Sequence, residues 1–181
     1  MQFTKTALDG VLKMEPRVFT DDRGSFYESF NAGAFEAAIG ASPAFVQDDH
    51  SMSTRGVLRG LHYQLPRAQG KIVRVITGEI FDVVVDLRRG SATHGRWHSE
   101  LLSADNRTML WIPPGFAHGF LTLSDAAEVL YKVTDQWCPD HQHCIRWNDP
   151  TLAIRWPLDG PPVVSPKDRA GQPFDRAPQF D

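Results

Sequence analysis

Short apolar runs separated by turn residues fill the middle of the chain, and this pattern predicts a series of β-strands. Residues 71–77 are rich in β-branched side chains, and apolar and polar side chains alternate in residues 80–87. With Gly78 as a turn between them, these two segments predict a hairpin. Further strands are predicted at residues 97–102, 108–112, 116–123 and 127–133. Their regular spacing is typical of a β-sandwich or a β-barrel.

One short helix precedes the strands, and an irregular tail follows them. Asn31 is a suitable N-cap for a helix over residues 32–39, which would end near Gly40. The tail from Pro157 onward is rich in Pro, Gly and Asp, and we expect it to cover the surface without regular elements. No linker divides the chain, so we expect a single all-β domain over residues 1–181. A closed barrel or a jelly-roll (cupin-like) barrel would leave no strand edge exposed.

Composition narrows the function classes. The 181 residues are 41% hydrophobic and 23% charged, as in an ordinary folded domain. The net charge of -3 argues against general affinity for nucleic acid or acidic membranes, so an anionic ligand would need a local basic cluster. No apolar stretch is long enough for a signal peptide or a membrane span. Cys138 and Cys144 cannot form a disulfide framework, which favours a reduced, cytoplasmic setting.

The segment RGVLRGLHYQ, residues 55–64, is the densest group of chemically active side chains. Arg59 offers a guanidinium suited to phosphate, and His62 offers a base that titrates near neutral pH. In a regular strand these two side chains lie on opposite faces. They reach one pocket if Gly60 allows a β-bulge, or if Arg59 reaches around the strand end. The alternative is an ordinary strand with a core histidine and a surface arginine.

Three other segments carry weaker signals. In IPPGFAHGF, residues 112–120, His118 shares a strand face with two phenylalanines, which suits either a ligand pocket or a core histidine. Tyr131 lies on an apolar strand face and needs a hydrogen-bond partner if it is buried. Lys167 and Asp168, in the tail segment SPKD, could reach a site from outside the sheets or could form a solvated loop.

A metal site is not expected from the histidine pattern. Of seven histidines, only His141 and His143 are separated by a single residue, and they follow Pro139 in a predicted turn. His62 and His118 could be ligands, but no nearby carboxylate pattern completes a site around them. Serine-hydrolase and phosphate-loop motifs are absent as well.

Taken together, the motifs resemble those of the dTDP-4-dehydrorhamnose 3,5-epimerase family. In order they are RGVLRGLHYQ, Lys71, GEIFDVVVDLR, IPPGFAHGF, LYKVTD, WNDP and SPKD. The N-terminal DRGSFYE, residues 22–28, also resembles that family's opening motif. The resemblance extends from about Phe19 to Asp168, which is most of the chain.

The resemblance implies an enzyme that converts dTDP-4-dehydro-6-deoxy-glucose to dTDP-4-dehydro-rhamnose by inverting carbons 3 and 5. Both carbons adjoin the carbon 4 ketone, so a base can remove their protons to give an enolate. His62 would be the base, and Asp168 would pair with it and fix its tautomer. Lys71 would face the oxyanion, and Tyr131 would be the acid on the opposite face. No metal or organic cofactor is implied, because the ketone already acidifies these protons.

The resemblance also implies a substrate-binding set and an assembly. The set is Phe19, Arg23, Glu28, Gln47, Asp49, Arg59, His118, Trp137, Gln142 and Lys167. Arg23, Arg59 and Lys167 would supply positive charge for the diphosphate. The family exchanges its N-terminal strands within a homodimer, so Phe19, Arg23 and Glu28 would serve the neighbouring subunit's site. The implied pathway supplies rhamnose for a bacterial surface polysaccharide.

Three positions depart from the family pattern. Asp49 stands where the family usually has Asn, and it would repel a diphosphate unless it is protonated or bonded to another donor. Gln136 and Trp137 replace a usual Tyr-Tyr pair, and Trp137 can stack on thymine but supplies no phenol proton. Gln142 stands where Glu is frequent.

Two other function classes stay open. One is a single-position epimerase or a ketoisomerase that acts on a related dTDP-4-keto-6-deoxy sugar. The other is a non-catalytic sugar-binding barrel. The presence of His62, Asp168, Lys71 and Tyr131 argues against the second, because a pure binder needs no acid opposite a base.

Overall fold

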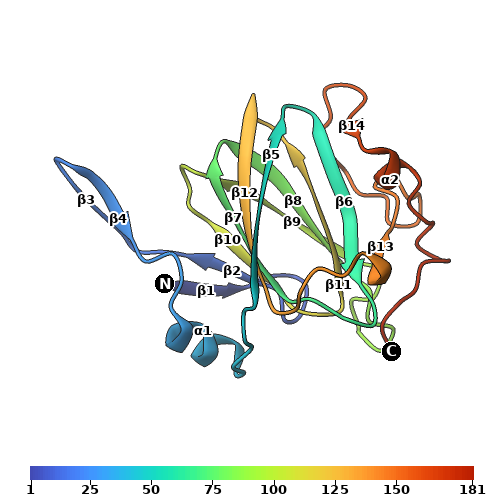
Figure 1. The fold of residues 1–181 in the computed structure, drawn as a ribbon, viewed down its shortest axis with the longest axis horizontal. Helices are drawn as coiled ribbons and strands as arrows, with labels where there is room; N and C mark the ends of the chain where they lie inside the picture. The colour runs from blue at the N-terminus through green and yellow to red at the C-terminus, as the bar shows by residue number, and fades with distance from the viewer.

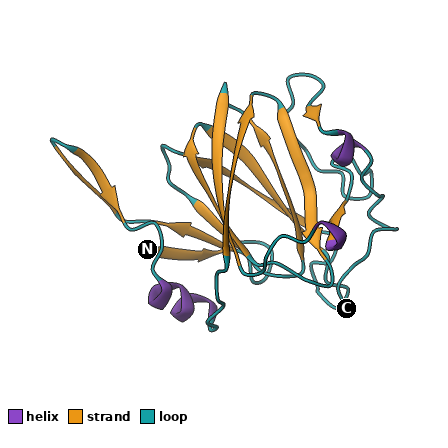
Figure 2. Ribbon diagram, in the orientation of Figure 1, coloured by secondary structure: helices purple, strands orange, loops and turns teal.

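The computed structural model describes residues 1–181, which form two large β-sheets with little helix (Figures 1 and 2). The first sheet has the order β1 (Gln2–Lys5), β2 (Leu12–Glu15), β10 (Met109–Ile112), β7 (Lys71–Thr77), β12 (Ala126–Val133) and β5 (Gln47–Thr54). The second has the order β13 (Gln142–Cys144), β6 (Val57–Gln64), β11 (Phe116–Thr122), β8 (Glu79–Asp86) and β9 (Trp97–Ser103), with β14 (Val163–Val164) also paired to β6. The predicted all-β fold is confirmed. Neither sheet closes on itself into the expected barrel.

The main hydrophobic core lies between the two sheets. Its members come from β7, β10 and β12 on one side and from β8, β9 and β11 on the other, with Leu8 and Val11 from the loop after β1. Phe120, Leu110 and Val129 are among its buried side chains. The inner faces of the two sheets therefore share one interior.

The hairpin predicted around Gly78 is wrong, although both of its strands exist. β7 pairs with β10 and β12, whereas β8 pairs with β9 and β11. The chain crosses from one sheet to the other at Gly78, which has a φ of 77°. A Cβ at this position would lie 2.1 Å from the carbonyl oxygen of Ala126. Alternation fixes which side chains share a face, but it does not specify which strand is the partner.

The predicted N-terminal helix is confirmed as α1 (Ala32–Ile39). The Asn31 side chain accepts a hydrogen bond from the Ala34 N–H at 3.0 Å, and Gly40 ends the helix in the left-handed conformation with a φ of 70°. Phe35 anchors the helix to the first sheet, its ring centroid 5.0 Å from that of Trp111. Immediately before the helix, the hairpin of β3 (Val18–Asp21) and β4 (Gly24–Tyr27) extends away from the two sheets (Figure 1).

The tail contains more regular structure than its composition predicted. β14 joins β6 as a parallel strand, and α2 (Pro166–Arg169) forms one helical turn. Ser165 caps α2 by accepting a hydrogen bond from the Asp168 N–H at 3.1 Å. Such short elements have no periodic hydrophobic signature, but Ser followed by Pro is a helix-start signal that composition alone concealed. A further short turn, η1 (Pro139–His141), precedes β13, and no helix of the protein has the length and apolar character to cross a membrane.

Candidate active site

A β-bulge at Gly60 brings the active segment of β6 onto one inner face. His62 lies opposite His118 of β11, and Arg59 lies opposite Phe120. The two β6 residues between Arg59 and His62 therefore lie opposite the one β11 residue between His118 and Phe120. Gly60 has a φ of 120°, and a Cβ there would lie 2.6 Å from the Cα of Gly119. Because Phe120 belongs to the core, Arg59 and His62 both face the interior. Of the alternatives open from the sequence, the bulge is the one observed.

A histidine–carboxylate pair lies next to this bulge. His62 Nε2 is 2.6 Å from Asp168 Oδ1, and the Gly60 N–H donates to Asp168 Oδ2 at 3.1 Å. The Asp168 side chain is almost fully buried, whereas 28% of the His62 side chain is exposed. Although burial favours a raised pKa, the hydrogen bond and charge of His62 and the Gly60 N–H hold the pKa of Asp168 below its ordinary value. Asp168 is therefore an ionised acceptor that can orient His62 and stabilise its protonated form.

This pair opens into a cavity of about 340 Å³. Arg59, Gln142 and Lys167 also line the cavity, so two cationic side chains stand beside the base. The positive charge absent from the protein as a whole is thus gathered locally, as an anionic ligand requires.

Tyr131 enters the interior from the opposite sheet. It packs against the main core, and its ring meets the ring of His118 edge-on at a centroid distance of 6.2 Å. Its hydroxyl is 3.2 Å from the Ser51 hydroxyl. Burial raises the pKa of Tyr131 well above its ordinary value, and the phenol is therefore protonated at neutral pH. His62 and Tyr131 both adjoin His118, one from each sheet, which suits a base and an acid on two sides of a bound ligand.

Lys71 is a buried amine under the electrostatic influence of two carboxylates. Burial lowers the pKa of Lys71 to about 8, while the negative charges of Asp82 and Asp49 act to raise it. Asp82 is itself fully buried and accepts a hydrogen bond from His118 Nε2 at 2.7 Å. Lys71 therefore carries a positive charge over much of the neutral range and forms no ion pair within 4.0 Å, so it can face a developing oxyanion.

Hydrogen bonds join five of the predicted binding residues to one another: Gln47, Asp49, Trp137, Gln142 and Lys167. Trp137 donates from its backbone N–H to Gln47 at 3.0 Å and from its indole N–H to Gln142 at 3.2 Å. Gln142 also accepts a hydrogen bond from Lys167 at 2.5 Å. Gln47 donates to Asp49 at 2.7 Å, so this unusual carboxylate is bonded to another donor, which is one of the two conditions set from the sequence.

Three predicted binding residues lie apart from the site within this chain. Phe19 and Arg23 belong to the hairpin that extends from the body (Figure 1). The Arg23 side chain pairs with Asp21 instead. Glu28 follows the hairpin and accepts a hydrogen bond from Asn31 at 3.1 Å. None of the three contacts His62, Asp168 or Lys167.

Sequence reasoning missed several residues of this site. Ser51 lies on β5, which was not predicted because its sequence QDDHSMST has no apolar alternation. The carboxylate of Asp168 lies next to His62, as the family motifs implied, whereas Asp82, which lies next to His118, was not expected. Cys144, a neighbour of the pair and not one of the proposed catalytic or binding residues, lies directly across from His62 on β13 and was not expected there. No local sequence signal reports contacts between segments this far apart.

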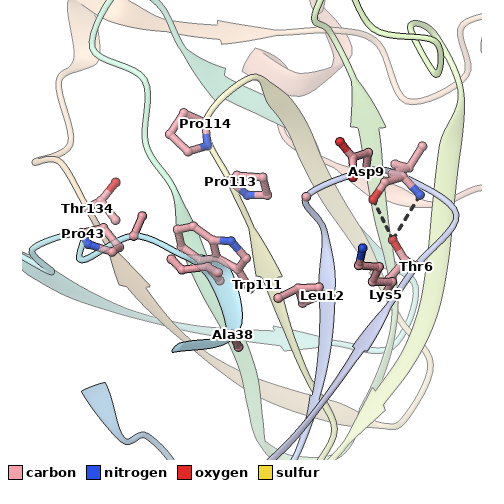
Figure 3. Close-up of a pocket in the computed structure, with 14 residues that line it drawn as sticks. Lys5, Thr6, Asp9, Leu12, Ala38, Pro43, Trp111, Pro113, Pro114 and Thr134 are labelled. Atoms are coloured by element: carbon pink, nitrogen blue, oxygen red, sulfur yellow. Dashed lines mark hydrogen bonds between the residues drawn. The ribbon is translucent and has the colours of Figure 1, made fainter. Parts of the chain in front are cut away.

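A larger cavity, of about 500 Å³, lies elsewhere, at the junction of the β1–β2 loop and the end of α1 (Figure 3). Trp111, Leu12 and the prolines 113 and 114 form much of its wall. The Thr6 hydroxyl in this cavity is bonded to the backbone of Leu8 at 3.2 Å (Figure 3). This cavity has no histidine, and its two charged residues, Lys5 and Asp9, form no ion pair, so its size does not make it the reactive site.

The two sheets bring together the groups that acid–base chemistry requires. A carboxylate-oriented histidine lines a cavity with two cationic side chains, and the same interior contains a buried amine and a phenol on the opposite sheet. A family model described as dTDP-4-dehydrorhamnose 3,5-epimerase matches residues 5–176. The chain belongs to this family, as its motifs predicted.

Individual relatives agree with this family assignment. The dTDP-4-dehydrorhamnose 3,5-epimerase of Pseudomonas aeruginosa is 59% identical over 180 residues, which are 99% of each chain. The crystal structure of dTDP-6-deoxy-D-glucose-3,5-epimerase from Legionella pneumophila, in complex with dTDP-4-keto-L-rhamnose, has a TM-score of 0.95 at 45% identity and covers 99% of this chain and 98% of its own. A 3'-monoepimerase from Streptomyces bikiniensis, in complex with dTDP-quinovose, has a TM-score of 0.89 at 33% identity and covers 94% of this chain and 86% of its own.

Proposed function

We propose that this protein inverts carbons 3 and 5 of dTDP-4-dehydro-6-deoxy-glucose to give dTDP-4-dehydro-rhamnose. The observation that carries the proposal is the 2.6 Å contact between His62 and Asp168, in a cavity that also contains Arg59 and Lys167. Similarity to the enzymes of Pseudomonas aeruginosa and Legionella pneumophila supports the same substrate class.

In the first half of the reaction, His62 removes the proton next to the carbon 4 ketone. Asp168 accepts a hydrogen bond from His62 Nε2, and its negative charge stabilises the imidazolium that forms. The electrons move into the ketone to form an enolate, and the ammonium of Lys71 stabilises the oxyanion in a site with little water.

In the second half, Tyr131 returns a proton to the opposite face of the same carbon. Because burial raises its pKa, the phenol of Tyr131 stays protonated until the enolate forms. The sequence of abstraction and return is then repeated at the second carbon. No metal or organic cofactor takes part, because the neighbouring ketone supplies the acidity, and we expect full activity after chelator treatment.

Arg59 and Lys167 bind the diphosphate, and Trp137 stacks on the thymine. Two glutamines, Gln47 and Gln142, hold Trp137 by its backbone and indole N–H groups and leave 55% of the residue exposed for such a contact. His118, almost completely buried and bonded to Asp82, would line the sugar side of the site.

The assembly belongs to the same proposal: a homodimer of single-domain chains, each a jelly-roll sandwich, that exchange the hairpin of β3 and β4. Phe19 and Phe26 on this hairpin are 51% and 73% exposed, which is costly for large apolar side chains unless a second copy covers them. Phe19, Arg23 and Glu28 would then complete the neighbouring subunit's site. Sedimentation of a fully active monomer would contradict this arrangement. A cytoplasmic location is supported by the two free cysteines, Cys138 and Cys144.

Proton exchange with heavy water, read by NMR of the sugar, tests the reaction. Exchange at both carbon 3 and carbon 5, with formation of the rhamno product, is expected. A single exchanged carbon would instead indicate a single-position epimerase, an alternative supported by similarity to the Streptomyces bikiniensis 3'-monoepimerase and by the unusual Asp49, Trp137 and Gln142. No exchange would refute the acid–base role of the site.

A further inference from the structure

A third potential ligand atom lies beside the histidine–carboxylate pair, and the proposed reaction does not use it. Cys144 on β13 is directly across from His62 on β6. One donor atom from each of Cys144, His62 and Asp168 lies within 4.8 Å of the other two. The thiol is not part of a disulfide, and its neighbours are the carbonyl oxygens of Ile145 at 3.6 Å and Asp168 at 4.0 Å. These are weak contacts for a sulfur donor, so the side chain can turn without losing a strong hydrogen bond.

The three donors form a set that suits a soft divalent cation. Zinc takes thiolate, imidazole and carboxylate ligands at about 2.0–2.3 Å in a tetrahedral arrangement, which places the donor atoms roughly 3.5 Å apart. The contact between His62 and Asp168 would widen from its 2.6 Å, and the sulfur, already within 4.8 Å of both donor atoms, would turn toward the cation. Magnesium and calcium prefer oxygen ligands and match this set poorly.

We propose that His62, Cys144 and Asp168 form an inhibitory binding site for zinc or a similar soft divalent cation such as cadmium. This inference rests on the proposed function, because inhibition follows from His62 being the base. The cation takes the place of the proton between His62 and Asp168, which moves to Nδ1 of the neutral imidazole, and the thiol proton of Cys144 passes to solvent. A water molecule from the adjoining cavity completes the tetrahedron.

In the absence of a metal, the thiol of Cys144 is chemically inert. Burial and the negative charge of Asp168 raise the pKa of Cys144 to about 12, while Lys167 opposes this shift. Without a metal the group is therefore a neutral thiol, which neither competes for the proton of His62 nor reacts readily as a nucleophile.

Cadmium binding to the metal-free protein tests the site directly. A cadmium–thiolate bond gives an ultraviolet charge-transfer band, which we expect in the wild type with one cadmium bound per chain. Cys144→Ser should lose the band, whereas Cys138→Ser, which removes the other free thiol, should keep it. Absence of the band from the wild type, or its persistence in Cys144→Ser, would overturn the proposal.

Inhibition provides the second readout. Zinc or cadmium should stop proton exchange and turnover in the wild type and in Cys138→Ser, and a chelator should restore both. Metal-free Cys144→Ser should turn over like the wild type and should need at least about a hundredfold more metal for the same inhibition. Equal metal sensitivity of the two proteins would refute the site. If the metal-free wild type showed no turnover, the proposed function would fail, while the cadmium band would still decide whether the site exists.

Discussion

Replacing Tyr131 by Phe separates the proposed acid from the proposed base. The change removes a hydroxyl whose partner is Ser51, at 3.2 Å, and keeps the ring that packs against His118 and the core. Loss of one neutral hydrogen bond costs about 1 kcal/mol of unfolding free energy, which is small beside the stability of a typical domain. The variant should therefore fold and bind the nucleotide.

The expected catalytic loss is much larger than the loss of stability. A positioned general acid contributes about 10²- to 10⁴-fold to rate, which corresponds to roughly 3–5 kcal/mol of activation free energy. His62 and its 2.6 Å contact with Asp168 are untouched by the change, so removal of the sugar proton should continue. Tyr131→Phe should therefore keep measurable solvent exchange while losing most inversion.

The assay measures both quantities in one sample. NMR in heavy water reports deuterium at carbons 3 and 5, and the appearance of the rhamno product reports inversion. His62→Asn should abolish both signals, since no enolate forms without the base. Tyr63→Phe is a matched control, because it removes a buried hydroxyl that donates to the Pro178 carbonyl at 2.6 Å outside the site. Inversion at the normal rate in Tyr131→Phe would refute its assignment as the acid.

Three further predictions concern charge and backbone. The negative charge of Asp49 helps to keep Lys71 protonated, so Asp49→Asn should lower the pKa of Lys71 further below its present value of about 8. The loss of activity at alkaline pH should then begin about half a pH unit lower, and an unshifted pH profile would contradict this role. Gly60→Ala should lower the unfolding free energy by about 3 kcal/mol in chemical denaturation, because φ is 120° and the new Cβ would meet Gly119 at 2.6 Å; unchanged stability would show that the bulge can relax. Burial acts to raise the pKa of Asp86, but hydrogen bonds from an arginine and two hydroxyls outweigh it and lower this pKa to about 2. The ionised Asp86 therefore stabilises the fold fully above pH 3.8, and this contribution is lost as the pH falls through 2. Acid titration of unfolding should show the wild type losing about 2 kcal/mol more than Asp86→Asn, and parallel curves would exclude the effect.

Local patterns determined most of the individual elements. Strand β7 has the predicted bounds, Lys71–Thr77, and α1 begins and ends where Asn31 and Gly40 indicated. These features depend on residues a few positions apart, and the side-chain periodicity of a strand or the cap of a helix is already complete within such a segment. The family motifs likewise named His62 and Tyr131 before any contact was known.

The tertiary structure decided which segments meet. Strand β5 escaped prediction because Gln47, Asp49 and Ser51 point toward a polar site rather than an apolar core, which removes the alternation that marks a strand. The separation of β7 and β8 into different sheets is a choice among many partners of equal local merit. The approach of Asp168 to a histidine 106 residues earlier was expected from the family motifs, and no local signal reports it. Sequence periodicity assigns a face to each residue, but only the packing of both sheets around one core selects the neighbours, because burial and hydrogen bonding are satisfied by the whole arrangement.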